Sequence, residues 1–444
     1  MTHRRLLSVL ILSLLVPLSV AVAQDPVEQG VRIGITYTPG LRPGMLVLGG
    51  PRAEMLDTVR AILERDLDYS DQFEIISLPG GDSVVLGISG PQASGGSGDL
   101  YVNYSLYAAL GAEYSVAVLP SRDTSEFVVA VYDVKGENER RRVTLTAMDP
   151  LREDFRLSVH RAADAILQAV TGLPGFAATR LLFIQHGGLY RIDADGANPT
   201  PVSPAGVTAF SPAWAPGGMR AAYAQLENGL GKIVIHDFQT GARRTLRDTE
   251  TLLNISPAFS ADGGTLAFTR IAEEGAEVYR YNLARDCCLE RLTVGRFSDN
   301  LSPTFSPDGR QIAFVTTRAG GTQIYVMAAD GTGQELFAPF DYGVTGNSYA
   351  PDWSPDGTQI TFHRDVMGSP QVFVMETRSR EVRQLTSAGR NEDPTWAPDG
   401  RHIAFISNRT GRRQVWVIDI ETGRVRQLTT VGDARLPAWS PRLP

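Results

Sequence analysis

Cysteine is almost absent from this sequence of 444 residues. The two cysteines, Cys287 and Cys288, are neighbours in the chain. A framework of several disulfides is therefore excluded, and the spacing is not that of a C-x-x-C redox or metal motif. We interpret them as two small residues at a strand edge. A disulfide between them, which an oxidising compartment would permit, would stiffen one turn and no more.

Clustered positive charge is also lacking. Lysine and arginine number 42 against 49 acidic residues, and the net charge of −7 is spread along the chain. This pattern offers no basic patch for nucleic acid and no polybasic stretch for anionic lipid. The 6 histidines are scattered, and the hydrolase, zinc-protease and phosphate-loop motifs are missing. We therefore expect no catalysis, no cofactor and no metal.

The first 23 residues have the layout of a secretory signal peptide. Basic residues 3–5 precede an apolar run over residues 6–22, which ends in the small-x-small site Ala21-Val22-Ala23. The run is slightly shorter than the roughly 20 residues of a stable membrane span. An uncleaved anchor is the alternative. We expect cleavage after Ala23 and a mature chain that is soluble outside the cytoplasm.

A sequence repeat dominates the second half of the chain. A motif close to Ser-Pro-x-Trp-Ser-Pro-Asp-Gly recurs roughly every 43 to 48 residues, the period of propeller blades. Each unit predicts four short strands, because alternating apolar runs are separated by Asp-Gly and similar turns. The copies begin at Ser211, Ser256, Ser302, Ala350, Asp393 and Leu436.

The two ends of this repeat complement each other. Residues 181–203 supply three strands without a preceding Pro-x-Trp strand, and residues 436–441 supply that strand alone. Pairing them completes one blade and leaves no open sheet edge. We therefore predict an all-β six-bladed propeller closed by its N- and C-terminal strands.

One aromatic residue occupies the same place in every repeat. Its occurrence once per blade favours packing between blades over a ring that binds a ligand. The aspartates of the Asp-Gly turns are likewise interpreted as turn residues rather than calcium ligands. The aromatic residues are Trp214, Phe259, Phe305, Trp353, Trp396 and Trp439.

Residues 24–178 alternate strands with helices, which predicts a small α/β domain in front of a propeller at 179–444. His160 lies beside the apolar face of the last helix, and we interpret it as a partly buried, hydrogen-bonded structural residue. A Gly/Ser-rich loop is expected at 79–98. The expected strands are 31–36, 45–48, 73–76, 114–119, 127–134 and 142–146, and the expected helices are 55–67, 100–110 and 154–171.

The linkers before the Pro-x-Trp strands are candidates for partner binding. In a four-stranded antiparallel blade they lie at the same end as the turn between strands two and three, so they ring one mouth of the channel. Their short polar side chains either hydrogen-bond a docked partner or cap local turns, and both interpretations stay open. They read Asn254-Ile255-Ser256, Asn300-Leu301-Ser302, Asn347-Ser348-Tyr349 and Asn391-Glu392-Asp393.

These features together resemble one family, TolB. The propeller motif is shared by many propellers, but the terminal Pro437-Ala438-Trp439-Ser440-Pro441 is typical of TolB. Further resemblance lies in residues 31–48, in the helix and strand at 62–73, and in the junction at 160–180. The loop at 79–98 and the inserts before Pro351 depart from the family pattern.

The resemblance implies a periplasmic, monomeric adaptor without enzymatic activity. In this family the propeller mouth receives the lipoprotein Pal, and the mature N-terminal strand engages TolA, which suggests pairing along a sheet edge. By this resemblance the adaptor serves envelope integrity and outer-membrane constriction at cell division. It is attached to membranes only through its partners. The implied Pal-binding residues are Asn254, Ser256, Asn300, Leu301, Ser302, Asn347, Tyr349, Asn391 and Asp393; those for TolA are Val31, Arg32, Ile33, Gly34, Ile35 and Thr36.

Two other functions remain open at this point. The chain is alternatively a secreted propeller module that binds a peptide, a glycan or a small molecule. A propeller-gated peptidase is the third possibility, because related propeller repeats occur in prolyl-oligopeptidase-like enzymes.

Overall fold

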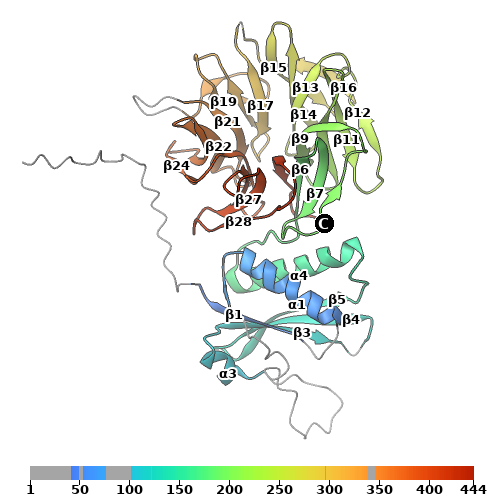
Figure 1. Cartoon of the computed structure of the whole chain (residues 1–444), viewed down its shortest axis with the longest axis vertical. Helices are drawn as coiled ribbons and strands as arrows, with labels where there is room; N and C mark the ends of the chain where they lie inside the picture. Colours follow the sequence, from blue (N-terminus) through green and yellow to red (C-terminus); the bar gives the residue numbers. More distant parts are fainter. Residues whose placement is uncertain (1–41, 50–53, 77–101, 122, 296, 339–345) are drawn as a thin grey trace, which may run out of the picture. The chain divides into compact units, whose positions relative to one another are not determined.

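The computed structural model describes residues 42–49, 54–76, 102–121, 123–295, 297–338 and 346–444. All of them belong to one compact unit. It contains an α/β region, from β1 to α4, and an all-β region, from β6 to β29 (Figure 1). The predicted signal peptide, the strand at 31–36 and the loop at 79–98 lie outside the described residues.

The α/β region is built on one mixed five-stranded sheet with the order β2-β1-β3-β4-β5. β1 pairs in parallel with β2 and β3, whereas β3, β4 and β5 are antiparallel. α1 connects β1 to β2, so a helical connection joins these two parallel strands. The strands are β1 (Gly44–Leu48), β2 (Glu74–Ile75), β3 (Tyr114–Pro120), β4 (Glu126–Asp133) and β5 (Asn138–Thr146).

Helices cover both faces of this sheet. α1 (Glu54–Tyr69) and α4 (Glu153–Thr171) lie together on one face (Figure 1), and α3 (Tyr104–Ala109) packs on the other. Alternate residues of β3 serve the two cores, because successive strand side chains point to opposite faces. α4 ends at Gly172, whose φ of 74° is the left-handed conformation that glycine adopts without penalty. None of the described helices is long and apolar enough to cross a membrane.

The all-β region consists of successive antiparallel groups. The first groups are β6 (Arg180–Gln185), β7 (Gly188–Asp193) and β8 (Thr200–Pro201); β9 (Thr208–Trp214), β10 (Arg220–Glu227), β11 (Leu230–Asp237) and β12 (Arg243–Thr245); and β13 (Leu253–Phe259), β14 (Thr265–Ala272), β15 (Gly275–Asn282) and β16 (Cys287–Arg291). The remaining groups are β17 (Asn300–Phe305), β18 (Gln311–Thr316), β19 (Gln323–Ala328) and β20 (Glu335–Leu336); β21 (Ser348–Trp353), β22 (Gln359–Val366), β23 (Ser369–Glu376) and β24 (Val382–Gln384); β25 (Asn391–Trp396), β26 (His402–Ser407), β27 (Gln414–Asp419) and β28 (Val425–Gln427); and β29 (Ala434–Trp439).

These groups form four four-stranded sheets and one eight-stranded sheet. The larger sheet joins the group β9–β12 to the group β13–β16 through a single pair, Gly231 with Leu253. A Cβ atom on Gly231 would lie 2.6 Å from the carbonyl oxygen of Asn254. Glycine is therefore required here, because the two backbones approach too closely for a side chain.

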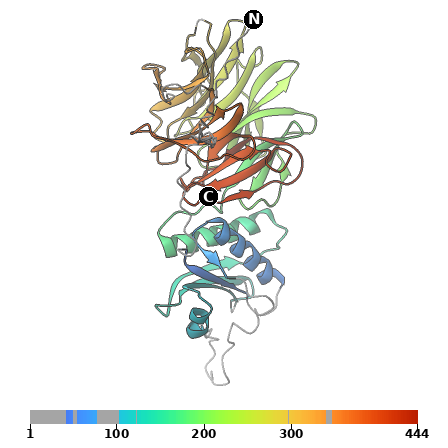
Figure 2. The ribbon, with the colours of Figure 1, turned by 60° about the vertical axis from the view of Figure 1, so that its left-hand side comes forward.

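The C-terminal strand β29 pairs with β6, which confirms the predicted pairing of the two ends (Figures 1 and 2). Ala434 lies opposite Gln185, and Trp439 lies opposite Leu181. Beyond the strands, the Ser440 hydroxyl accepts a hydrogen bond of 2.9 Å from the Arg180 N–H. The pairing gives β6 a partner on the side that would otherwise be a free edge.

Contacts between the inner strands follow the chain order. β9 contacts β13, β13 contacts β17, β17 contacts β21, β21 contacts β25, and β25 contacts β29. β29 in turn contacts β9. The structure is thus an all-β propeller fold preceded by a small α/β region, as the sequence predicts.

The repeated aromatic residues pack between neighbouring groups, as predicted. Trp353, Trp396 and Trp439 are nearly buried, and Trp353 contacts core residues of the preceding group such as Ile324. Trp214 donates from Nε1 to the carbonyl oxygen of Ala438, 3.1 Å away in β29. Each large ring therefore joins two sheets.

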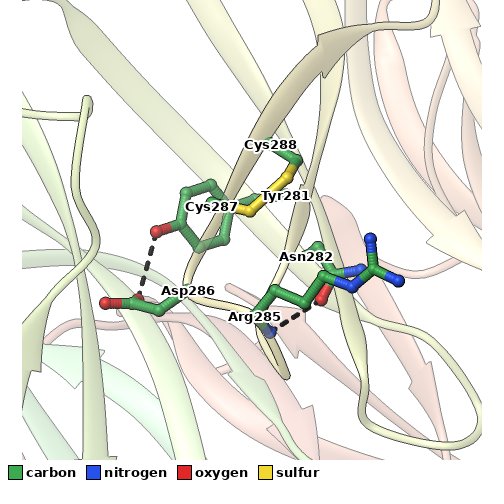
Figure 3. Close-up of a disulfide and its surroundings, with 6 residues drawn as sticks. All are labelled: Tyr281, Asn282, Arg285, Asp286, Cys287 and Cys288. Atoms are coloured by element: carbon green, nitrogen blue, oxygen red, sulfur yellow. Dashed lines mark hydrogen bonds between the residues drawn. A yellow bond between two sulfur atoms is a disulfide. The ribbon is translucent and has the colours of Figure 1, made fainter.

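Cys287 and Cys288 form a disulfide in β16 (Figure 3), contrary to our interpretation of them as two unlinked small residues. Cys288 has a φ of 68°, the left-handed conformation that few non-glycine residues adopt. Sequence spacing alone does not reveal this conformation, because it depends both on the bulge where β16 pairs with β15 and on the disulfide itself.

We expect Trp439→Ala to lower the free energy of unfolding by about 3–5 kcal/mol, the usual cost of truncating a buried large aromatic residue. It also removes the 2.8 Å hydrogen bond from Nε1 to the Thr179 hydroxyl. Chemical denaturation followed by circular dichroism measures the loss. Val431→Ala is the control, since this side chain is 71% exposed. A loss below about 1 kcal/mol, typical of a surface substitution, would contradict the role of Trp439.

Candidate partner-binding channel

Each inner strand contains a residue with positive φ directly before its proline. This conformation is rare for residues other than glycine and costs roughly 1–3 kcal/mol per residue. Such residues persist where the surrounding structure holds them, often at functional sites. They are Ser211 (47°), Ser256 (51°), Ser302 (49°), Ala350 (48°), Asp393 (54°) and Leu436 (50°).

The pairing of the strands explains this conformation. Proline has no N–H to give to a ladder, and at each of these sites the register shifts. Ser256 and Pro257, for example, lie between the pairs Ile255–Thr269 and Ala258–Ala267, so that both oppose Phe268. The inner strand therefore bulges at the proline, opposite a buried aromatic residue. In the other groups this aromatic is Phe183, Tyr223, Phe314, Phe362 or Phe405.

The bulges surround a cavity of about 470 Å³. Ser256, Ser302 and Asp393, three of the predicted partner-binding residues, line it. The cavity continues past the prolines to the repeated aromatic residues. The inner strands thus build a channel whose wall is set by the bulges.

Three titratable groups with shifted pKa values lie in or beside the channel: Asp352, Asp393 and His363. Burial raises the pKa of Asp352 to about 6. Burial, with repulsion from Glu392, raises the pKa of Asp393 to about 7. Burial, with repulsion from Arg390, lowers the pKa of His363 to about 4. Near neutral pH, His363 is therefore uncharged, and Asp393 is only partly ionised.

His363 is held by groups on both sides of its ring. Its Nδ1 accepts a hydrogen bond of 3.1 Å from the Asp393 N–H. The ring of Tyr349 stacks on it, with 5.2 Å between the ring centroids. The Asp393 side chain itself is 25% exposed. A ligand in the channel would therefore meet the carboxyl group before the imidazole.

The predicted asparagines are buried. The side chains of Asn254, Asn300 and Asn391 have no exposed surface. Asn254, for instance, donates from Nδ2 to the carbonyl oxygens of Gly231 and Thr249, both at 2.8 Å. These contacts support the turn-capping interpretation of the asparagines, and leave the partner-binding role to residues nearer the channel.

Asn347 does not occupy the repeat position that its sequence context suggested. Ser348 pairs with Arg364 as Asn391 pairs with Ser407, so Ser348 is the structural equivalent of the buried asparagines. Asn347 lies one residue earlier, and its Oδ1 accepts the Thr322 N–H at 2.9 Å. Asn347 is thus offset by one residue from the buried asparagines, and its side chain takes a different face because strand side chains alternate; its partner-binding role stays a prediction. Leu301 and Tyr349 are partly exposed.

Sequence reasoning missed an arginine that binds each of these buried positions. Arg318 donates to Asn300 Oδ1 at 2.9 Å and lies over the rings of Phe314 and Tyr325. Arg409 binds Asn391 in the same way. Arg270 and Arg364 repeat the arrangement with Asn254 and Ser348.

The spacing explains why this arginine escapes detection. Arg270 and Arg364 stand two residues after the phenylalanine that faces the bulge. Arg318 and Arg409 stand four residues after it. The longer spacing places the arginine beyond the strand, in the turn. The guanidinium groups reach equivalent places only after folding.

The opposite end of the all-β region binds the α/β region through charges. Arg424 donates to Asp71 at 2.8 Å and to Asp68 at 3.1 Å, both at the end of α1. His402 also contacts Asp71, with Nε2 3.2 Å from the carboxylate. Arg426 lies over the ring of Tyr69. These residues come from the strand and turn ends opposite the predicted docking mouth.

A second charged cluster involves the predicted structural histidine. His160 is buried, and its Nδ1 lies 2.6 Å from Asp66 Oδ2, which confirms the prediction. Asp195, from the turn after β7, binds Arg156 of α4 and Arg65 of α1. The cluster thus ties both helices to the all-β region.

Two groups of residues bring three possible metal ligands together, Asp66–His160–Asp195 and Asp71–His402–Asp419. In both groups arginines already pair with carboxylates: Arg156 with Asp195, Arg424 with Asp71, and Arg401 with Asp419. Guanidinium groups supply the positive charge that a cation would otherwise bring. We therefore describe both groups as ion-pair networks.

The fold and the channel define a class, that of β-propeller proteins with an N-terminal α/β region. A family model described as the TolB beta propeller domain matches residues 167–339 and 342–443. The chain therefore belongs to the TolB β-propeller family.

Individual relatives agree with this assignment. The protein named Tol-Pal system protein TolB in Methylococcus capsulatus is 32% identical over 238 residues, which cover 51% of this chain and 50% of the relative. Its namesake in Aromatoleum aromaticum is 31% identical over 195 residues, covering 43% and 42%. The chain thus spans about half the length of the curated relatives it matches. These relatives are proteins of the Tol-Pal system.

A solved structure shows the same fold over a longer range. The crystal structure of TolB from Acinetobacter baumannii has a TM-score of 0.75, covering 92% of this chain and 98% of that chain. The sequences are 23% identical, so this likeness bears on the fold alone.

The capping interpretation predicts a loss of stability on Asn391→Ala. The substitution removes the hydrogen bonds that the buried Asn391 side chain makes with Arg409 and Gln371, which should lower the free energy of unfolding by about 1–3 kcal/mol. Asn347→Ala is the matched control, with a smaller expected loss of about 1 kcal/mol, because its two hydrogen bonds, with Thr322 and Asp365, are only partly buried. Urea denaturation of both variants measures the difference. Equal losses would mean that the buried position has no special role.

The contact between His402 and Asp71 predicts that stability falls as the pH rises. Burial alone would lower the pKa of His402, but Asp399 and Asp71 outweigh it and the pKa is raised. The stabilisation is complete below the unfolded-state pKa of about 6.5 and is lost as the pH rises through the folded-state value. NMR titration of the ring, with denaturation at several pH values, measures it.

Asp71→Asn is the control for this titration, because it removes one of the two carboxylates and leaves Asp399. The pKa of His402 should fall in this variant, and the dependence of stability on pH should shrink. A His402 ring that titrates at or below about 6.5 in the unaltered protein would contradict the prediction.

Proposed function

We propose that this chain is a non-enzymatic periplasmic adaptor of the Tol-Pal system, built on a closed six-bladed propeller. It links a Pal-like lipoprotein of the outer membrane to a TolA-like protein of the inner membrane, in support of envelope integrity and constriction at division. The family assignment supports membership in the system. The pairing of β29 with β6 and its contact with β9 support the six-bladed ring, with the eight-stranded sheet counted as two blades.

The observation that carries the docking proposal is an apolar rim. It comprises Val294, Phe297, Met367 and Val431, whose side chains are between 71% and 104% exposed. Val294 and Phe297 lie between β16 and β17, Met367 lies between β22 and β23, and Val431 lies between β28 and β29. In an antiparallel four-stranded blade these connections all share one end. Exposed apolar side chains on connections that share one end offer a candidate protein interface.

The two ends of the propeller differ in a way that favours this mouth. The end opposite the apolar rim is occupied by the ion pairs from Asp68 and Asp71 to Arg424. At the apolar rim, the channel below offers hydrogen-bonding groups at Ser256, Ser302 and Asp393. An apolar rim around a polar centre fits a folded protein partner that inserts a polar segment.

The proposed TolA contact depends on the resemblance alone. The residues from Val31 to Thr36 lie outside the described part of the chain. Alternating Val31, Ile33 and Ile35 would suit a strand that adds to the sheet edge of a partner. In the proposed adaptor this segment engages the inner-membrane protein while the channel mouth holds the lipoprotein.

The channel groups are assigned to binding rather than to catalysis. The Nδ1 atom of His363 already accepts the Asp393 N–H, so that nitrogen is not available as a base. With its pKa lowered to about 4, the imidazole is also a weak base. Asp393, at 25% exposed, is suited to accept hydrogen bonds from a partner.

The alternative function is a binding module for a peptide, glycan or small molecule. The cavity volume of about 470 Å³ favours it, because pockets for small ligands span roughly 300–1,000 Å³. The two functions differ in whether the exposed apolar rim contributes to binding. A small ligand within the channel would not reach Phe297 or Met367.

We expect the double substitution Phe297→Ala and Met367→Ala to weaken binding of a soluble Pal-like domain at least about tenfold, since interface anchors dominate affinity. Thermal stability should hardly change, because both side chains are fully exposed. Calorimetric titration with the purified domain measures affinity. Leu151→Ala is the matched control, because that leucine is 92% exposed in the α/β region.

Unchanged affinity in the double variant would reject the apolar rim as the docking surface. If the Pal-like domain does not bind the unaltered protein at all, the adaptor proposal fails. Binding of a peptide or glycan that depends on Asp393, but not on Phe297 and Met367, would then favour the binding module.

A further inference from the structure

The disulfide between Cys287 and Cys288 lies at an accessible edge of the propeller. β16 is the last strand on its side of the eight-stranded sheet, so its outer edge is unpaired in the sheet. Cys288 is exposed and Cys287 is half-buried. A reactant in solution can therefore approach the bond without unfolding of the sheet, and it meets Cys288 first.

The disulfide is built into a bulge. The pairs Asn282–Cys287 and Arg280–Glu290 leave Tyr281 opposite both Cys288 and Leu289. Because the cysteines are neighbours in the chain, their Cα atoms are 3.8 Å apart, and the disulfide closes a small ring, whereas most disulfides join residues about 4.4–6.8 Å apart. The ring therefore holds Cys288 in its left-handed conformation, with φ of 68°.

The turn next to the disulfide is attached to the neighbouring group of strands. Tyr281 donates from its hydroxyl to Asp286 at 3.1 Å (Figure 3). Asp286 also pairs with Arg244 of β12 at 2.7 Å and with Arg247 at 3.2 Å. The turn before the disulfide therefore also carries Asp286, which links the group β13–β16 to the group β9–β12.

We propose that Cys287–Cys288 is a thiol–disulfide exchange site for a dithiol, whose reduction releases the bulge in β16. Disulfides that are exposed and constrained belong to the exchangeable class, whereas buried structural disulfides resist reduction. The inference depends on this strand and its contacts alone, so it does not depend on the adaptor function.

The exchange follows a defined path. A thiolate of the dithiol attacks Sγ of Cys288, the bond to Sγ of Cys287 breaks, and Cys287 leaves as a thiolate that takes up a proton. The second thiol of the reductant then attacks the mixed disulfide. The reductant leaves as a cyclic disulfide, and Cys288 becomes a thiol. The protein gains two electrons and two protons, and the dithiol loses them.

Reduction removes the covalent ring, so that Cys288 is free to leave the left-handed region. The turn that carries Asp286 then loses its fixed connection to β16. We expect weaker protection of the backbone amides in residues 281–291 and of the partner strand around Arg244. The rest of the propeller keeps its inner strands, which lie away from this edge.

The test uses the full oxidised chain with dithiothreitol as the dithiol and no denaturant. Alkylation and mass spectrometry count the thiols, and hydrogen–deuterium exchange compares the oxidised and reduced forms. We expect two thiols to appear and exchange to accelerate over residues 281–291 and 243–247. The double variant Cys287→Ser with Cys288→Ser is the control, because dithiothreitol should not change its exchange pattern.

Two results would overturn the proposal: a disulfide that stays closed until the chain is unfolded, or one that opens without a change in exchange. The single variants test which of the two sulfur atoms reacts first. With Cys287→Ser, the remaining Cys288 thiol should form a mixed disulfide with oxidised glutathione about tenfold faster than Cys287 does in Cys288→Ser, because it is more accessible. Equal or reversed rates would contradict attack at Cys288.

Discussion

The pairing of β29 with β6 is the interaction on which the arrangement of the all-β region depends. It joins residues that are more than half the chain apart and gives β6 a neighbour on its open side. Because β29 also contacts β9, the strand stands between the first and last groups. Trp439 and Ser440 then bind Thr179 and Arg180, where the α/β region meets the propeller. The pairing of β29 with β6 and the attachment of the α/β region thus involve the same few residues.

The channel follows from the same strand arrangement. Proline in each inner strand cannot donate to its neighbour, so the strand bulges and the preceding residue takes a positive φ. The backbone strain is offset by the buried aromatic residue opposite each bulge. In four groups, an arginine also joins the aromatic pair to a buried asparagine or serine. Packing outside the channel therefore maintains the shape of its wall.

The two ends of the propeller have different chemistry. One end carries ion pairs to both helices: Asp71, after α1, pairs with His402 and Arg424, and Arg156 of α4 pairs with Asp195. The connections between strands at the other end carry exposed apolar side chains, among them Phe297 and Met367. A surface already satisfied by ion pairs has little to offer a further partner, whereas exposed apolar area gains free energy when it is covered. This asymmetry is the physical reason why we propose a docking surface at the mouth.

Much of the fold could be predicted from the sequence because it depends on local pattern. Alternation and turn residues located most strands, helical spacing located α1 and α4, and the incomplete units at residues 181–203 and 436–441 predicted the pairing of β29 with β6. His160 was correctly interpreted as structural. Each of these inferences needs only residues that are close in the sequence, or a repeat that is visible when the sequence copies are aligned.

Which residues belong to the candidate channel could be seen only in the tertiary structure. The sequence placed three asparagines at the mouth, Asn254, Asn300 and Asn391, but in the structure they are buried. Each binds an arginine, and the spacing of that arginine from the aromatic residue varies between groups. The exposed rim and the bond between Cys287 and Cys288 also depend on which strands become neighbours. The sequence by itself determined the repeat, the strands and the closing pair. Only the tertiary structure decided which side chains face the channel, because burial is set by residues brought together from distant parts of the chain.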